Sequence, residues 1–282
     1  MVKIVTDNSA DIPTELAWEL GISIIPLYVR FGDKVYREGV NINIDGFYCE
    51  LAQSKQRPQT STPSPGDFIQ LYEHLAEETD EIISLHLSLR YSSTCNVASL
   101  AAGYVKEKCK VEVIDSGTAS MGLGLIVIAA ARAAQRGASM KEIREIISNA
   151  IPHTHLFAII TNLDYVMKGS RLFVPGPWVV LAKIGMKFHA RIFGEITEGR
   201  TRPIGVYLRE GDLFNSLERR IAAYNIRDIA LLRSTSPVWE QEFVRRAGML
   251  SHNGQIYMAR YGCLTGIQAG PCAMGIAFNE GD

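Results

Sequence analysis

Short clusters of polar side chains follow several apolar runs of this 282-residue chain, at residues 6–9, 88–94, 115–116 and 161–162. The clusters are rich in hydroxyl groups and contain no lysine. If the apolar runs are parallel strands of an open α/β sheet, the clusters lie at the carboxyl ends of the strands, where such sheets bind ligands. Helix N-termini at that edge add unpaired N–H groups and partial positive charge, which favours a small anion such as a carboxylate or phosphate. Helix capping is the more ordinary role of any single cluster, so only their recurrence favours a ligand site.

Residues 60–65 form a further polar segment, with four hydroxyl side chains and two prolines in six residues. Ser64 and Pro65 predict the capped start of a helix. Thr60 and Ser61 precede this cap, and the prolines stiffen the loop that carries them, which leaves their hydroxyls free to donate to a ligand. The chemistry of the segment leaves two interpretations open: a helix start alone, or a helix start preceded by a ligand-binding loop.

The familiar catalytic signatures are missing from the sequence. It contains no G-x-x-x-x-G-K-[ST] phosphate loop, G-x-G-x-x-G, H-E-x-x-H or G-x-S-x-G motif. His153 and His155 share one face of a predicted strand but have no third ligand close in sequence, so no metal site is predicted. His86, inside an apolar strand, is predicted to be a hydrogen-bonded core histidine. A Ser-His-Asp arrangement assembles in space and leaves no sequence signature, so hydrolase chemistry stays an alternative.

The composition excludes several classes of protein. A hydrophobic share of 47% fills a core, which excludes intrinsic disorder. A net charge of −1 gives no general attraction to nucleic acid. The five cysteines form no Cys-x-x-Cys pair, which argues against a disulfide framework or a zinc knuckle and favours a reducing compartment. The longest apolar stretch, residues 119–131, is shorter than the roughly 20 residues that span a bilayer, so we expect a cytoplasmic protein without a transmembrane segment.

The alternation of apolar runs with helical patterns predicts an α/β fold with two domains. Strands are expected in the first part at residues 2–5, 22–29, 82–87, 111–114 and 157–160. They are predicted to form a Rossmann-like parallel sheet with helices on both faces. Glycines and prolines in residues 168–177 then prevent a long helix. We therefore expect an N-terminal α/β domain at residues 1–162 and a smaller C-terminal α/β domain at residues 163–282, with the ligand between them.

Motifs spread over nearly the whole chain occur in the order found in one protein family. They lie at residues 5–13, 25–27, 36–40, 60–64, 88–94, 114–116, 168–171, 200–201 and 270–275. Each motif is weak by itself, but so many in the same order are specific. The chain resembles the DegV family, which consists of bacterial proteins that bind fatty acids and serve as the lipid-binding subunit of fatty acid kinase.

The resemblance implies which residues hold the ligand. In that family, hydroxyls of a Thr-Ser loop and an inner serine hold the fatty-acid carboxylate, and an apolar tunnel buries the tail. The matching residues here are Thr60, Ser61 and Ser92, helped by the backbone amide of Ser93. Gln268 stands where the family usually has a histidine. A glutamine still donates a hydrogen bond, but it cannot carry the proton or charge of a histidine.

The resemblance also implies what the protein does. We expect a non-catalytic protein, without a metal or cofactor, that binds a long-chain fatty acid such as palmitate and presents its carboxylate to a kinase subunit. Arg200 falls on an arginine of the family's partner-facing region, and Arg202 stands nearby. The alternative is an enzyme of the same fold, a hydrolase or phosphotransferase that acts on a small anionic substrate. Gln268 keeps this alternative open, because the loss of a head-group partner is one way to change ligand.

Overall fold

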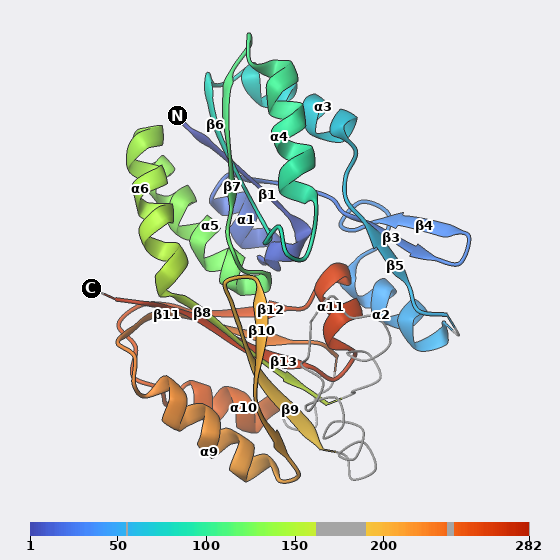
Figure 1. Ribbon diagram of the computed structural model, residues 1–282, viewed down its shortest axis with the longest axis vertical. Coiled ribbons are helices and arrows are strands. Elements are labelled where there is room, and N and C mark those ends of the chain that lie inside the picture. The colour runs from blue at the N-terminus through green and yellow to red at the C-terminus, as the bar shows by residue number, and fades with distance from the viewer. Residues whose placement is uncertain (55, 162–189, 236–239, 282) are drawn as a thin grey trace.

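The computed structural model describes residues 1–54, 56–161, 190–235 and 240–281. Figure 1 shows two large sheets with helix α5 (Ser120–Gln135) between them, and a small sheet that projects to one side. Helix α5 contacts strands of both large sheets, so it belongs to the core that joins them. The predicted break at residues 168–177 and the predicted domain boundary after residue 162 lie outside the described residues. The division into two domains at that point therefore stays a prediction.

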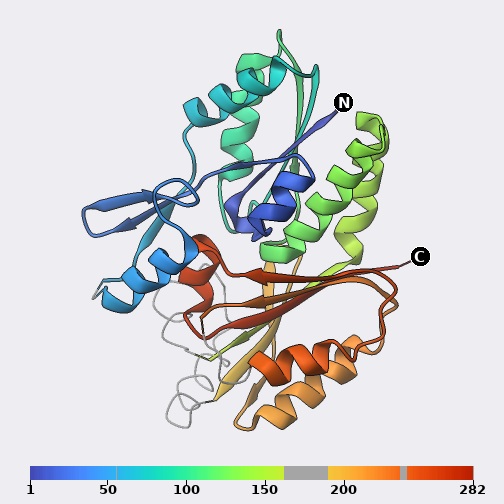
Figure 2. The ribbon, with the colours of Figure 1, turned by 180° about the vertical axis from the view of Figure 1, so that it is seen from behind.

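The first large sheet is parallel throughout, in the order β2-β1-β6-β7. Its strands are β1 (Lys3–Asp7), β2 (Ile22–Ile25), β6 (Glu81–His86) and β7 (Lys110–Asp115). Its helices and 3-10 turns are η1 (Asn8–Ala10), α1 (Thr14–Glu19), α3 (Pro65–Ala76), α4 (Thr94–Val105), α6 (Met140–Ala150) and η2 (Ile151–His153). Helices α3 and α4 cover one face, and α1, α5 and α6 cover the other (Figure 2). This arrangement confirms the predicted parallel sheet with helices on both faces.

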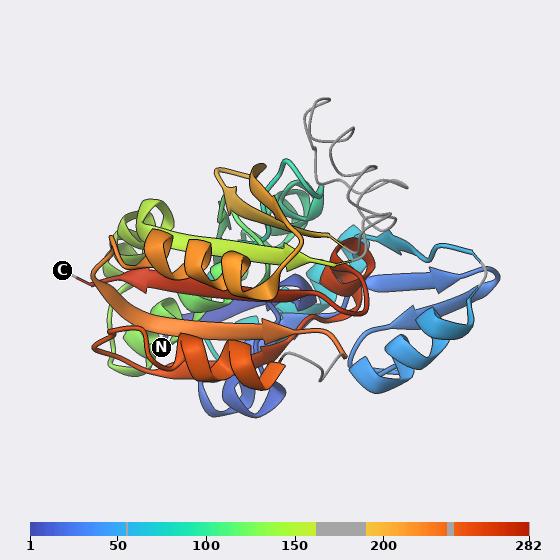
Figure 3. The ribbon, with the colours of Figure 1, turned by 90° about the horizontal axis from the view of Figure 1, so that it is seen from below.

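The second large sheet is mixed, in the order β10-β9-β8-β13-β11-β12. Its strands are β8 (Thr154–Ile160), β9 (Arg191–Thr197), β10 (Arg200–Tyr207), β11 (Ile226–Arg233), β12 (Ile256–Arg260) and β13 (Met274–Glu280). Helices α9 (Glu210–Ile221) and α10 (Glu240–Ala247) lie over its outer face, as Figure 3 shows from below. The short helix α11 (Cys263–Ala269) follows β12 and lies near the small sheet.

One strand belongs to a different sheet from the one predicted. Residues 157–160 are extended as expected, but they are part of β8, which pairs antiparallel with β9 and β13 in the second sheet. The prediction of a parallel strand in the first sheet is therefore wrong. Both faces of β8 are buried, so its continuous apolar run carries no information about its neighbours or direction.

The small sheet was not predicted, and it changes the setting of the Thr60 segment. It contains β3 (Tyr28–Phe31), β4 (Lys34–Arg37) and β5 (Gln59–Ser61), and α2 (Ile44–Gln53) packs on it. The strand expected at residues 22–29 is split, because Pro26 has no N–H for a ladder and Leu27 donates instead to the Asn8 side chain at 3.1 Å. Thr60 and Ser61 consequently lie on a strand rather than in a loop. The cap predicted after them is confirmed, since Ser64 and Asp67 form a reciprocal capping box.

Candidate functional site

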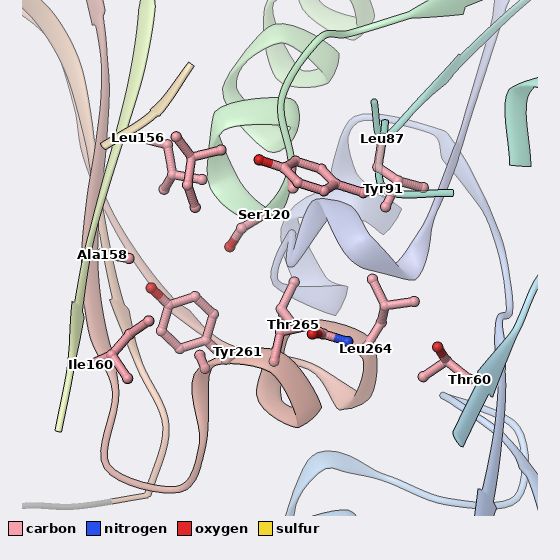
Figure 4. Close-up of a pocket in the computed structure, with 14 residues that line it drawn as sticks. Thr60, Leu87, Tyr91, Ser120, Leu156, Ala158, Ile160, Tyr261, Leu264 and Thr265 are labelled. Carbon is pink, nitrogen blue, oxygen red and sulfur yellow. The ribbon is translucent and has the colours of Figure 1, made fainter. Parts of the chain in front are cut away.

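A largely apolar cavity lies between the two large sheets (Figure 4). The space between the lining atoms, including the opening to solvent, is about 700 Å³. The apolar lining consists of Leu87, Ala119, Leu156, Ala158, Ile160, Ile196, Leu264 and Ala269. The polar side chains in the lining are Thr60, Tyr91, Ser120, Tyr261, Thr265 and Gln268.

Strand β8 builds one wall of this cavity through simple alternation of its side chains. Leu156, Ala158 and Ile160 line the cavity, whereas Phe157 and Ile159 pack on the opposite face against the core under α9 and α10. Ala158 is the smallest of the three cavity-facing residues, and it leaves room in the middle of the wall. The buried apolar strand that the sequence predicted therefore separates the core under α9 and α10 from the cavity.

Two of the five residues predicted to bind a carboxylate line the same cavity. These are Thr60, on β5, and Gln268, near the end of α11. They are separated by more than 200 positions in the sequence, and the fold brings the small sheet and α11 together to form one side of the cavity.

The other three predicted residues do not line the cavity. Ser61 follows Thr60 on β5 and is exposed, since neighbouring strand residues point to opposite faces. Ser93 is exposed at the N-cap of α4 and makes no side-chain capping bond. Ser92 is buried, with its hydroxyl 2.8 Å from that of Thr94, and it directly follows the cavity-lining Tyr91. The ligand-binding roles of these residues stay predictions.

The two arginines predicted to face a partner are both exposed. Arg200 and Arg202 lie on β10, the edge strand of the second sheet. Arg202 forms an ion pair at 3.2 Å with Glu198, which lies in the turn between β9 and β10. Gly199, at the tip of that hairpin, donates from its backbone to the Gly117 carbonyl, which ties the hairpin to the first sheet near the cavity.

A buried carboxylate behind the cavity wall was missed by the sequence analysis. Asp11 accepts hydrogen bonds from the hydroxyl of Ser120, from the backbone of Gly262 at 2.9 Å and from the hydroxyl of Thr265 at 2.9 Å. We call these four residues the Asp11 cluster. Because Ser120 and Thr265 line the cavity, the cluster fixes the start of α5 and the start of α11 on either side of it.

The Asp11 cluster is strained and electrostatically unusual. Ser120 has a φ angle of 52°, in the left-handed region that costs most non-glycine residues about 1–2 kcal/mol, and Asp11, with a φ of 53°, ends η1 in the same region, which aspartate adopts more readily. Burial raises the pKa of Asp11 to about 8, although its hydrogen bonds oppose the shift. Strain of this kind persists only where the surrounding structure enforces it, and it concentrates at functional sites.

A second buried acid, Glu38, caps the same helix. The backbone N–H of Cys263 donates to Glu38 Oε1 at 2.9 Å, next to the bond from Gly262 to Asp11. Burial raises the pKa of Glu38 to about 7. The two carboxyl groups thus satisfy the first N–H groups of α11, which no side chain of the helix itself caps.

The expected core histidine is confirmed, and its surroundings have the order of a Ser-His-Asp arrangement. His86 Nδ1 lies 2.8 Å from Asp7 Oδ2, and Nε2 lies 2.7 Å from the hydroxyl of Ser84. Tyr72 donates to the same serine oxygen at 2.7 Å. All four side chains are fully buried, and Ser84 has no surface on which a substrate would meet it. The arrangement therefore acts as a hydrogen-bonded core network beneath α3.

Two other observations bear on the class of site. Within the described residues, no three or more His, Cys, Asp or Glu side chains are grouped so that they would hold a metal ion. No described helix combines the length and the apolar character that crossing a bilayer requires.

Comparisons with known sequences identify relatives along the whole chain. A DegV domain-containing protein of Caldanaerobacter subterraneus is 36% identical over 171 residues, which are 61% of this chain and 60% of that protein. The chain thus covers less than two thirds of this relative. A second DegV domain-containing protein, from Deinococcus radiodurans, is 28% identical over 277 residues, which are 98% of this chain and 97% of that protein.

Solved structures share the fold over the full length. A DegV family protein from Thermus thermophilus, described by its fatty acid binding, superposes with a TM-score of 0.84 at 24% identity over 99% of each chain. A stearic-acid-binding protein from Eubacterium ventriosum superposes with a TM-score of 0.86 at 21% identity, over 99% of this chain and 98% of that one. The model of the DegV family, described as uncharacterised proteins, matches residues 1–280. The chain belongs to the DegV family.

Proposed function

We propose that this protein binds a long-chain fatty acid, with the tail in the cavity between the sheets and the carboxylate beside Thr60 and Gln268. The observation that carries the proposal is the cavity itself. One wall consists of apolar side chains of β8 and β9, Leu87 and Ala119 face it from segments that follow strands of the first sheet, and hydrogen-bonding side chains enter it from β5 and α11. A DegV family protein and a further protein of the same fold are described as binders of fatty acid and of stearic acid, respectively, which supports this ligand class.

The energetics favour such a ligand. Burying a 16-carbon tail at about 0.8 kcal/mol per methylene supplies on the order of 12 kcal/mol before ordering costs are subtracted. The head group then needs only to avoid a desolvation penalty. Charge-assisted hydrogen bonds of roughly 1.5–3 kcal/mol each offset that penalty without a direct ion pair. A hydroxyl and a carboxamide are therefore sufficient at the mouth of an apolar cavity.

The direct test is to identify what the purified protein carries. Native mass spectrometry, followed by solvent extraction, is expected to find about one fatty acid per chain, and the delipidated protein is expected to rebind palmitate. A chain that carries no lipid and does not bind palmitate after delipidation contradicts the proposal. Binding of a small anionic metabolite instead supports the alternative of an enzyme.

We propose that the hydroxyl of Ser92, which directly follows the cavity-lining Tyr91, assists that of Thr60 at the head group, so that removing both hydroxyls weakens fatty-acid binding severely. The double variant Thr60→Val with Ser92→Ala should lose roughly 10–100-fold in palmitate affinity for each lost charge-assisted bond, measured by displacement of a fluorescent fatty acid. Ser99→Ala, an exposed serine on the same α4 that follows Ser92, serves as the matched control and should bind as the wild type does. Unchanged affinity in the double variant refutes the head-group assignment.

We further propose that the bound carboxylate is presented to an ATP-dependent fatty acid kinase subunit, which contacts the exposed β10 edge. Arg200→Ala is then expected to leave palmitate affinity unchanged and to reduce acyl-phosphate formation with the kinase subunit at least tenfold. Arg136→Ala, at an exposed arginine after α5, is the control. Equal acyl-phosphate formation by wild type and Arg200→Ala argues against this surface, and acyl-phosphate formation without any kinase argues against the division of labour.

A further inference from the structure

A buried tyrosine in the lining of the cavity has a hydroxyl group without a hydrogen-bond partner. Tyr261 lies just before α11, lines the cavity and is 3% exposed. Within the described residues, its Oη makes no hydrogen bond. Burial raises the pKa of Tyr261 well above its usual range, so the hydroxyl keeps its proton at physiological pH. A buried hydroxyl without a partner is unfavourable, which points to a bound ligand as the group that accepts this proton.

The hydroxyl of Tyr261 lies at the part of the wall where we expect the tail. Figure 4 shows the ring beside the cavity, with the hydroxyl directed at β8 next to Ala158. Gly275 of β13 pairs with Ala158, and a side chain at Gly275 would collide with Tyr261 Oη. The hydroxyl therefore lies next to the room that the small Ala158 side chain leaves in the middle of the wall. No hydrogen bond to a described residue opposes the small rotation of the ring that would turn this oxygen toward a tail.

An acceptor lies in the same part of the cavity. Asp11 accepts from the backbone N–H of Gly262, which follows Tyr261, at 2.9 Å, and it is also bonded to the hydroxyl of Ser120. The Asp11 carboxyl group thus holds Tyr261 and Ser120 near each other, and Figure 4 shows the Ser120 hydroxyl directed into the cavity on the side of Tyr261. A hydroxyl oxygen has two lone pairs, so that of Ser120 can accept a further hydrogen bond while it is bonded to Asp11.

We propose that Tyr261 and Ser120 form a polar subsite along the tail that accommodates a fatty acid with an oxygen on its chain, such as a hydroxy or keto fatty acid. This inference rests on the proposed fatty-acid binding and narrows the class of ligand. A hydroxyl group on the tail accepts from Tyr261 and donates to Ser120, whereas a keto group accepts from Tyr261 alone. A plain methylene chain forms neither bond and leaves the Tyr261 hydroxyl without a partner.

The test measures how affinity depends on the position of the oxygen along the chain. Displacement of a fluorescent fatty acid compares stearate with hydroxystearates that carry the hydroxyl at successive positions. The wild type is expected to bind one isomer at least as tightly as stearate and the others more weakly, because their hydroxyl is buried against apolar side chains. In Tyr261→Phe the ratio of affinities for that isomer and for stearate should fall about tenfold. Tyr104→Phe, at an exposed tyrosine on α4, is the control and should keep the wild-type ratios.

A keto group at the same position separates the two residues of the subsite. Ketostearate accepts from Tyr261 but has no proton for Ser120, so Tyr261→Phe should lower the affinity ratio to stearate for both ligands, and Ser120→Ala should lower it for hydroxystearate only. The ligand-free Tyr261→Phe protein should unfold at a temperature no lower than the wild type, because it loses no hydrogen bond of the hydroxyl. The same dependence on oxygen position in wild type and Tyr261→Phe overturns the subsite and leaves fatty-acid binding intact. Failure of the wild type to bind stearate and each of its oxygenated forms instead overturns the proposed function.

Discussion

Replacing Ala158 by phenylalanine is expected to abolish long-chain fatty-acid binding, with at least a 100-fold loss of palmitate affinity. Ala158 lies in the middle of the β8 wall and faces the cavity, so a benzyl group at this position occupies the space in which the tail would lie. Ala158 is also a buried residue of the core that joins the two sheets, and the added ring points into the cavity beside that core, so the free energy of unfolding should fall by no more than the roughly 1–3 kcal/mol of ordinary overpacking. Fluorescent fatty-acid displacement and thermal unfolding measure the two effects separately.

A graded series makes this prediction sharper. Ala158→Val adds less volume at the same position and should weaken binding less than Ala158→Phe does. Ala52→Phe adds the same ring to an exposed position of α2 and should leave affinity unchanged. If Ala158→Phe is well folded and still binds palmitate as the wild type does, the tail lies elsewhere and the cavity between the sheets is not the fatty-acid site.

The stability of the protein is expected to fall as the pH rises from about 5 to about 8, and Asp11→Asn should remove much of this fall. Burial raises the pKa of Asp11 from 3.8 to about 8. Between these values the folded state keeps the proton that the unfolded state has lost, so unfolding releases a proton and becomes easier as the pH rises. One such group lowers the free energy of unfolding by up to roughly 1.4 kcal/mol per pH unit in this window. Glu38, whose burial raises its pKa to about 7, acts in the same direction.

Asparagine fits the position of Asp11 because its oxygen accepts from Gly262 and Thr265 while its NH₂ donates to the Ser120 hydroxyl. Urea unfolding at several pH values should therefore give a variant that is more stable than the wild type at pH 8 and similar to it near pH 4. The difference in unfolding free energy between the two proteins at each pH separates the contribution of Asp11 from that of His155. Burial lowers the pKa of His155, but hydrogen bonds to Glu195 and Glu280 outweigh burial and raise the pKa overall. The folded protein therefore holds this proton more tightly than the unfolded chain does, and the stability that it contributes is lost as the pH rises above 6.5. Parallel pH profiles for wild type and Asp11→Asn would show that Asp11 is ionised in the folded protein.

The local parts of the fold were predictable because they depend on neighbours in sequence. The alternation of apolar runs with helix starts predicted the parallel sheet and its covering helices, and the Ser64 cap formed where the residues indicated it. The sheet to which residues 157–160 belong was not predictable. A strand buried on both faces has the same pattern whether its neighbours are parallel or antiparallel, near or distant.

The same division holds for the candidate site. Motifs that survive as short local segments identified Thr60 and Gln268, and the structure brings both to one cavity. The sequence by itself thus determined the fold class, the family resemblance and part of the cavity's polar rim. Only the tertiary structure decided that Asp11 joins residues 109, 251 and 254 positions away, and that the Tyr261 hydroxyl lies beside Ala158. These contacts depend on how separate elements pack, and no local pattern of side chains records which distant residue a buried carboxylate or tyrosine will meet.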